Sequence, residues 1–218
     1  MHIVVAGNIG SGKTTLTEML SEHYGWIPQY EAVSYNPYLE DYYTDIARWA
    51  FPMEVYFLKE RFRDMLALEE AGNTVIQDRS IFEGVYVFAA NNHAQGHMSD
   101  RDVQTYMELF QLMIRLTHTP DLMIYLRASI PHLVSNIQKR GRDYEQTIQL
   151  DYLKGLNASY EDFVFNKYPG RYIVVDKDHS DFQHIPEDFS AITDRIDSEL
   201  FGLFGPSQQT TKQNASCI

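Results

Sequence analysis

One stretch near the N-terminus decides the fold: Gly7-Asn8-Ile9-Gly10-Ser11-Gly12-Lys13-Thr14, directly after an apolar run at residues 2–6. Its glycines let backbone N–H groups turn inward around a phosphate chain without Cβ clashes. The helical spacing that follows predicts a helix whose N-terminus attracts an anion. We predict a nucleotide-binding phosphate loop (P-loop) with ATP contacts from Gly7 to Thr15, in which Lys13 bridges the β- and γ-phosphates and Thr14 ligates Mg²⁺. The alternative is an ordinary Gly-rich turn.

Short apolar runs alternate along the chain with segments of helical spacing, which predicts a parallel sheet covered on both faces. We therefore expect an α/β, P-loop kinase fold at residues 1–204, with a five-stranded parallel sheet. Residues 205–218 have the composition of a disordered tail. The apolar runs are residues 2–6, 26–30, 74–77, 122–126 and 172–175, and the helical segments are 13–23, 44–71, 100–117, 130–140, 148–166 and 187–203.

Composition and charge exclude several classes of protein. The 218 residues carry a net charge of −12, which argues against nucleic acid as the main partner, because binding to its backbone relies on positive charge. The apolar runs are far shorter than the roughly 20 residues of a membrane helix, so no membrane partner is expected. A single cysteine, Cys217, suits a reducing compartment. We expect a cytoplasmic protein.

The rest of the sequence narrows the kind of P-loop protein. A GTPase would carry Asn-Lys-x-Asp, whereas Asn166-Lys167 is followed by Tyr168-Pro169. A motor-type ATPase would place an acid at the end of a later strand, where this chain has Arg127. A small-molecule kinase remains, and it needs an acceptor site, a base and a cationic lid.

Charged side chains follow two of the predicted strands. Glu31 comes after the second, and Asp78-Arg79-Ser80 ends the third. Ligands of parallel sheets bind at the carboxyl ends of the strands, so Glu31 is expected to accept the hydroxyl proton. Asp78 would support Mg²⁺, and Arg79 would neutralise the transferred phosphate. The alternatives are a solvated loop carboxylate and a structural ion pair.

A cluster of cations closes the helix predicted at residues 130–140. Arg140, Gly141 and Arg142 follow Lys139, in a segment at about 139–146. Guanidinium groups around a hinge glycine suit a lid over nucleotide phosphates. A helix end favoured by the helix dipole is the alternative.

These motifs, in this order, resemble the deoxyribonucleoside kinases of the type related to deoxyguanosine and deoxyadenosine kinases, over residues 1–204. The stretch from Trp49 to Tyr56 resembles their nucleoside-binding helix. The resemblance implies a Mg²⁺–ATP-dependent enzyme that phosphorylates the 5′-hydroxyl of a deoxynucleoside. It also implies a homodimer, although the sequence does not separate a dimer from a tetramer. The apolar positions on a long helix are candidates for the interface: Leu109, Phe110, Leu112, Met113 and Leu116.

The resemblance also assigns site residues. It implies that Glu31 is the base and that Tyr43 and Glu145 read the sugar 3′-hydroxyl. Met53 and Phe88 would line the base pocket, with Arg79 at the 5′-hydroxyl. Three departures from the family stand out: Ala32 replaces a proline beside the base, Asn136 replaces a lid-helix arginine of some members, and Glu54 replaces a glutamine.

Glu54 bears on the choice of base. An ionised carboxylate only accepts hydrogen bonds, and guanine offers two neighbouring donors. Arg61 lies two helical turns further on the same face, where it would meet O6 or N7 of guanine. We therefore expect a purine substrate, with deoxyguanosine ahead of deoxyadenosine, unless Glu54 only pairs with Arg61 or Lys59. Gly84 would either widen the pocket for a purine or serve as a helix packing contact.

Two other functions remain open. A nucleoside monophosphate kinase, such as a thymidylate kinase, shares a P-loop, an Asp-Arg pair and a lid. It would need cations near Glu31 for its acceptor phosphate, whereas this chain has Glu40 and Asp41. A non-catalytic nucleotide-binding module is less favoured, because Lys13 and Arg79 are both retained.

Overall fold

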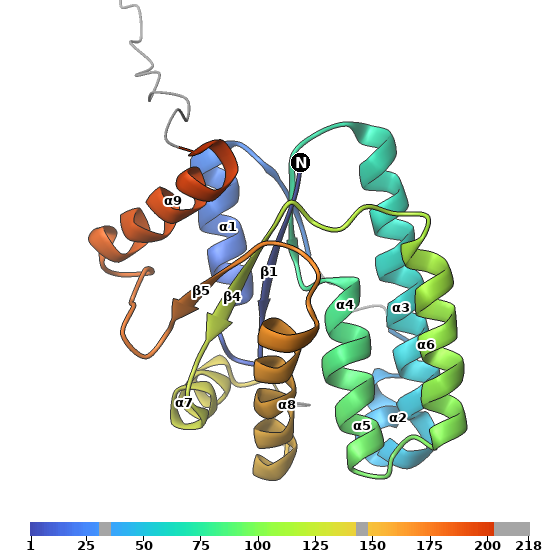
Figure 1. Cartoon of the computed structure of the whole chain (residues 1–218). Helices are drawn as coiled ribbons and strands as arrows, with labels where there is room; N and C mark the ends of the chain where they lie inside the picture. The colour runs from blue at the N-terminus through green and yellow to red at the C-terminus, as the bar shows by residue number, and fades with distance from the viewer. Residues whose placement is uncertain (31–35, 143–147, 203–218) are drawn as a thin grey trace, which may run out of the picture.

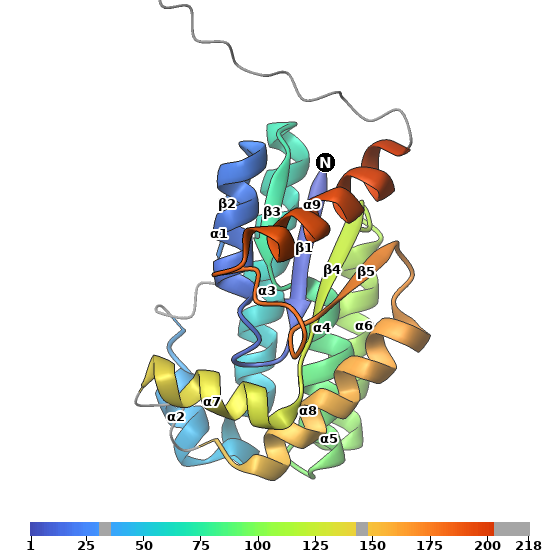
Figure 2. The ribbon, with the colours of Figure 1, turned by 90° about the vertical axis from the view of Figure 1, so that its left-hand side faces the viewer.

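The computed structural model describes residues 1–30, 36–142 and 148–202. These residues form a five-stranded parallel sheet in the order β2-β3-β1-β4-β5, with helices on both faces (Figures 1 and 2). The predicted fold is confirmed. The elements are β1 (His2–Gly7), α1 (Lys13–Tyr24), β2 (Ile27–Gln29), α2 (Leu39–Thr44), α3 (Ile46–Ala71), β3 (Val75–Asp78), α4 (Ile81–Glu83), the π-helical η2 (Gly84–Ala89), α5 (Ala90–Ala94), α6 (Asp100–Ile114), β4 (Leu122–Arg127), α7 (Ile130–Arg140), α8 (Leu150–Asp162), the π-helical η4 (Phe163–Lys167), β5 (Tyr172–Asp176) and α9 (Pro186–Phe201).

The central strand β1 shows why its sequence is apolar at every position. Ile3 and Val5 belong to a core shared with α1 and α9, whereas Val4 and Ala6 belong to a core shared with α3, α6, η2 and α8. Figure 1 shows these two groups of helices on opposite sides of the sheet. Alternate residues of a strand point to opposite faces, so both sets must be apolar when both faces are covered. Because β1 is the middle strand of the sheet, the P-loop that follows it lies at the carboxyl end of the central strand.

The helix predicted at residues 44–71 is α3, which begins at Ile46, and the short helix α2 that precedes it was not predicted. Asp45 leaves the helical conformation (φ −147°, ψ 82°), and its carboxylate accepts a hydrogen bond from the Arg48 N–H at 3.2 Å. Asp at an N-cap starts a new helix in this way, so α2 and α3 are separate helices. No described helix, α3 included, is both long enough and apolar enough to cross a membrane.

Besides α2, the helices α4, η2 and α5 were not predicted from the sequence. This segment is buried on several sides, including Val85, Val87 and Phe88, so it lacks the one-sided apolar spacing from which a helix is inferred. A start signal was present: Ser80 and Glu83 form a capping box at the first turn. This segment carries two side chains that matter for the site, Glu83 and Asn92.

Candidate active site

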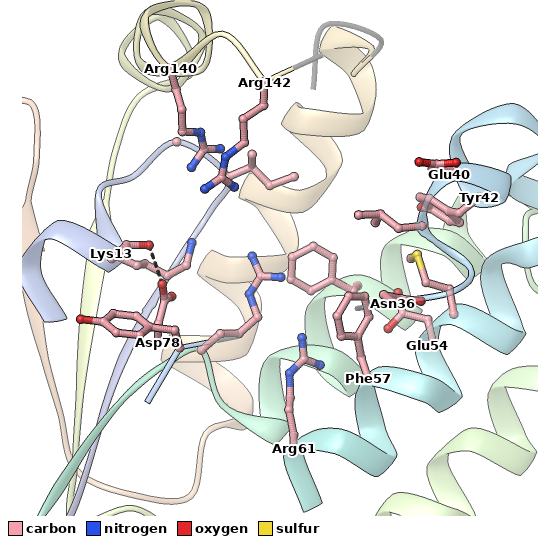
Figure 3. Close-up of a pocket in the computed structure, with 18 of the residues that line it drawn as sticks. Lys13, Asn36, Glu40, Tyr42, Glu54, Phe57, Arg61, Asp78, Arg140 and Arg142 are labelled. Atoms are coloured by element: carbon pink, nitrogen blue, oxygen red, sulfur yellow. Dashed lines mark hydrogen bonds between the residues drawn. The ribbon is translucent and has the colours of Figure 1, made fainter. Parts of the chain in front are cut away.

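A cavity of about 820 Å³ opens where β1 and β3 end, between the P-loop and helices α2, α3 and α8. Figure 3 shows Arg140 and Arg142 pointing into it above Lys13 and Asp78, with Glu54 and Tyr42 on the opposite side. The cavity brings together many of the predicted site residues: Ile9, Gly10, Lys13, Thr14, Met53, Glu54, Arg61, Asp78, Arg79, Phe88, Arg140 and Arg142.

The P-loop has the conformation that phosphate binding requires. Gly10 and Gly12 have φ angles of 84° and 91°, which side-chain-bearing residues rarely adopt. A Cβ on Gly10 would also lie 2.8 Å from the carbonyl oxygen of Leu133. The Lys13 ammonium donates to the carbonyl oxygens of Gly7 at 2.8 Å and Asn8 at 3.1 Å. The lysine charge is therefore held beside the loop, where phosphate oxygens would bind.

Side chains from α7 and α8 hold the P-loop in place. The Asn8 amide donates to the carbonyl oxygen of Leu153 at 3.2 Å and to the Asn157 side-chain oxygen at 3.1 Å. The Asn136 amide donates to the Gly10 carbonyl oxygen at 2.8 Å. Asn136, one of the departures from the family pattern, thus contacts the tip of the loop directly.

Thr14 and Asp78 form the pair expected at the metal site. The Thr14 hydroxyl donates to a carboxylate oxygen of Asp78 at 2.7 Å. A hydroxyl and a carboxylate are the hard oxygen donors that suit Mg²⁺, which usually takes its other ligands from phosphates and water. The described residues contain no cluster of three or more His, Cys, Asp or Glu side chains that could hold a metal alone. The donor set fits a metal that arrives with a nucleotide.

Arg79 has an unusual backbone. Its φ of 74° makes it the one non-glycine residue with a positive φ in the described part of the chain. Its N–H donates to the Val5 carbonyl oxygen at 3.0 Å, and its guanidinium lies 4.3 Å from the centre of the Phe88 ring. A left-handed conformation costs about 1–2 kcal/mol for such a residue. The turn after β3 tolerates this strain while Arg79 lines the cavity.

Glu83 lies behind this turn and was not identified from the sequence. It is fully buried, and its carboxyl group accepts hydrogen bonds from the Ser80 N–H at 2.6 Å, the Tyr160 hydroxyl at 2.8 Å and the Gly7 N–H at 3.4 Å. Burial raises the pKa of Glu83, and the nearby Arg79 guanidinium opposes that rise. One side chain therefore connects the start of the P-loop, the Arg79 turn and α8.

At the other end of the cavity, Glu54 and Arg61 are almost fully buried on one face of α3. The Asn92 amide donates to a Glu54 carboxylate oxygen at 3.1 Å. The Arg61 guanidinium lies 5.1 Å from the centre of the Phe57 ring. A buried carboxylate and a guanidinium on one wall can present hydrogen-bond acceptors and donors to a planar ligand.

Comparison with known proteins fits this geometry. A family model described as deoxynucleoside kinase matches residues 3–201. The chain belongs to the deoxynucleoside kinase family. Its relatives include a deoxyadenosine/deoxycytidine kinase from Bacillus subtilis, 39% identical over 77% of this chain and 79% of the relative. A deoxyguanosine kinase from Lactobacillus acidophilus is 36% identical over 91% of this chain and 90% of the relative.

A solved structure agrees as well. The deoxyadenosine kinase from M. mycoides, with products dCMP and dCDP bound, superposes with a TM-score of 0.81 at 30% identity, over 91% of this chain and all of that one. The predicted family, kinase activity and fold are therefore confirmed for this deoxynucleoside kinase.

Three predicted site residues cannot be placed in this kinase. Glu31 and Glu145 lie outside the described residues, and so does the side chain of Tyr43 in α2. The same holds for residues 143–146 of the predicted lid and for the predicted tail.

Gly84 corrects one expectation. It is not among the described residues that line the cavity. A Cβ at this position would lie 2.7 Å from an Arg61 guanidinium nitrogen and 2.9 Å from the Tyr106 hydroxyl. Gly84 therefore makes room for these two side chains, so packing and not pocket width explains it.

Sequence reasoning also missed cavity residues on α2 and α8. Tyr42 and Tyr152 line the cavity, and their hydroxyl groups lie 3.2 Å apart. The two residues are 110 positions apart in the chain, so no local spacing links them.

Proposed function

We propose that this kinase transfers the γ-phosphate of Mg²⁺–ATP to the 5′-hydroxyl of purine deoxynucleosides, with deoxyguanosine preferred to deoxyadenosine. One observation carries the proposal: a single cavity joins the P-loop and Asp78 at one end to Glu54 and Arg61 at the other. Relatives named as deoxyguanosine and deoxyadenosine kinases support a purine acceptor.

The phosphate end of the cavity suits phosphoryl transfer. Backbone N–H groups of the P-loop and Lys13 would hold the β- and γ-phosphates. Arg79, Arg140 and Arg142 line the same cavity and would neutralise the phosphoryl group during transfer. Thr14 and Asp78 would hold Mg²⁺, which when bound offsets the charge of the phosphate oxygens.

The acceptor end orients the deoxynucleoside. We assign Glu31 as the base that removes the 5′-hydroxyl proton, and Tyr43 with Glu145 as partners of the 3′-hydroxyl. Both assignments rest on the family resemblance of the sequence. Met53 and Phe88 line the cavity and would contact the base.

The preference for guanine follows from Glu54. A carboxylate matches the N1–H and 2-amino donors of guanine, whereas it faces the N1 lone pair of adenine. A mismatched buried group costs about 1–3 kcal/mol, enough to bias selectivity.

The test is ADP release from Mg²⁺–ATP with each of the four common deoxynucleosides and with deoxythymidine monophosphate. Turnover led by a purine deoxynucleoside supports the proposal. Turnover only with the monophosphate would indicate a nucleoside monophosphate kinase, and none at all a binding module. Replacing Glu54 by glutamine should lower the guanine-to-adenine ratio of kcat/KM, and an unchanged ratio would contradict its role.

We also propose that the enzyme is a cytoplasmic homodimer. Leu112 in the last turn of α6 and Leu116, two residues beyond its end, expose 60% and 65% of their surface, which suits contact with a second copy. Phe110 was expected at this interface from the sequence, but it is fully buried in the core of the subunit and cannot contact a second copy. Light scattering of wild type and Leu112→Glu tests the interface: a wild-type monomer would contradict it.

A further inference from the structure

Asn92 connects three side chains of the cavity wall without lining the cavity itself. It lies in α5 and is fully buried. Its amide nitrogen is 3.1 Å from a Glu54 carboxylate oxygen, and its amide oxygen is 3.0 Å from the Tyr42 hydroxyl. Tyr42 in turn lies 3.2 Å from the Tyr152 hydroxyl. One buried amide therefore links α3, α2 and α8.

The chemistry of these groups fixes the direction of each hydrogen bond. A carboxylate only accepts, so the Asn92 NH₂ group must face Glu54 and its oxygen must face Tyr42. The single hydroxyl proton of Tyr42 then goes to Asn92, which leaves Tyr152 as the donor to Tyr42. The backbone carbonyl oxygen of Asn92 accepts hydrogen bonds from the backbone N–H groups of His97 at 2.8 Å and Met98 at 3.3 Å. These backbone bonds hold the residue in place.

We propose that Asn92 is a positioning residue for substrate selection: its amide sets the hydrogen-bonding face that Glu54 presents to the base. The inference rests on the proposed function, in which Glu54 contacts the base. With the Asn92 donor satisfied by one carboxylate oxygen, Glu54 is held against the wall as an acceptor. A different group at position 92 would turn or protonate the side chain at position 54 and change the base that fits.

Two substitutions make the proposal quantitative. In Asn92→Asp, two buried carboxyl groups face each other and must share a proton. Glu54 then presents a donor part of the time, so the guanine-to-adenine ratio of kcat/KM should fall about tenfold. In Glu54→Gln, the Asn92 NH₂ group attracts the glutamine oxygen and leaves the glutamine NH₂ for the base, so the ratio should fall as well.

The double variant Glu54→Gln with Asn92→Asp reverses the pairing. The carboxylate introduced at position 92 would accept from the glutamine NH₂ and leave the glutamine oxygen for the base. The ratio should therefore rise again, to at least about fivefold above that of Glu54→Gln alone. This variant keeps one donor facing one acceptor and the wild-type charge, so it can be measured even if Asn92→Asp does not fold.

Asn91→Asp is the matched control. Asn91 is the adjacent residue on α5 and is also buried, but its side-chain oxygen accepts from Gln95 at 3.4 Å. Introducing the same charge there should leave the selectivity ratio within about twofold of wild type.

The experiment measures kcat/KM for deoxyguanosine and deoxyadenosine in wild type and the four variants. A ratio in the double variant equal to that of Glu54→Gln, or an equal shift in Asn91→Asp and Asn92→Asp, would overturn the role of Asn92 while leaving the kinase assignment intact. A wild-type enzyme that phosphorylates no deoxynucleoside would overturn the proposed function, and this inference with it.

Discussion

Replacing Glu83 by glutamine tests whether one buried carboxyl group holds the active site together. Three donors converge on its two oxygens: the Ser80 N–H, the Tyr160 hydroxyl and the Gly7 N–H. An amide of the same shape has one acceptor oxygen, and its NH₂ group would face at least one of these donors. A buried donor without an acceptor costs about 1–3 kcal/mol. For a chain of this size, we expect the Tm to fall by roughly 2–12 °C.

Activity should fall more than stability suggests. Gly7 begins the P-loop, and Ser80 follows the strained Arg79, so a shift of Glu83 displaces both the P-loop and the turn that carries Arg79. Displacements of about 1 Å can reduce a rate about 100-fold. We expect kcat of Glu83→Gln to fall at least about tenfold at saturating substrates, measured by ADP release alongside scanning calorimetry.

Tyr125→Phe is the control. Tyr125 stacks on Tyr160 with ring centres 5.9 Å apart, and its hydroxyl donates to the partly exposed carboxylate of Glu161 at 2.9 Å. Loss of that hydrogen bond should cost about 1 kcal/mol and leave kcat unchanged. If Glu83→Gln melts no lower than Tyr125→Phe and keeps its kcat, the argument for Glu83 is wrong.

Three further predictions concern the same site. Because burial raises the pKa of Glu83 above its ordinary value of 4.5, the part of its stabilisation that depends on protonation is complete below that pH and is lost as the pH rises through the folded pKa. The gap in unfolding free energy between wild type and Glu83→Gln should therefore narrow from pH 4.5 upward, and urea titrations showing a widening gap would contradict this. Asn136→Ala removes the hydrogen bond to the Gly10 carbonyl oxygen, which is worth about 1 kcal/mol. In steady-state kinetics, the KM for ATP should therefore rise roughly fivefold. An equal rise in the KM for the deoxynucleoside would contradict this prediction. Gly84→Ala places a Cβ 2.7 Å from Arg61, so KM for the deoxynucleoside should rise while KM for ATP stays constant; an unchanged deoxynucleoside KM would show that Arg61 yields without cost.

The parts of the site that the sequence predicted depend on local spacing. The P-loop is continuous, and Glu54 and Arg61 are two turns apart on one helix. Asp78 ends β3 and Arg79 follows it, and β3 pairs with β1 in the sheet, which brings both residues beside the P-loop. Each inference needed only a motif and the geometry of one element or one sheet edge.

The parts that were missed depend on buried polar pairs between distant segments. Glu83 and Tyr160 are 77 residues apart, and Asn92 and Glu54 are 38 apart. Hydrogen bonds of this kind cannot be predicted from periodic spacing in the sequence, because each partner is an isolated polar residue within an apolar segment. The helical segment that carries Glu83 and Asn92 was also not predicted, because a helix buried on several sides has no amphipathic pattern in its sequence.

The backbone of Arg79 has a consequence for directed evolution of this enzyme. A glycine there would relieve about 1 kcal/mol of conformational strain, yet it would also delete the guanidinium that lines the phosphate end of the cavity. At this position, a substitution that increases thermal stability therefore decreases the rate of catalysis. A library selected only for survival at high temperature would enrich inactive chains at position 79, so such a selection needs a simultaneous readout of phosphorylated product.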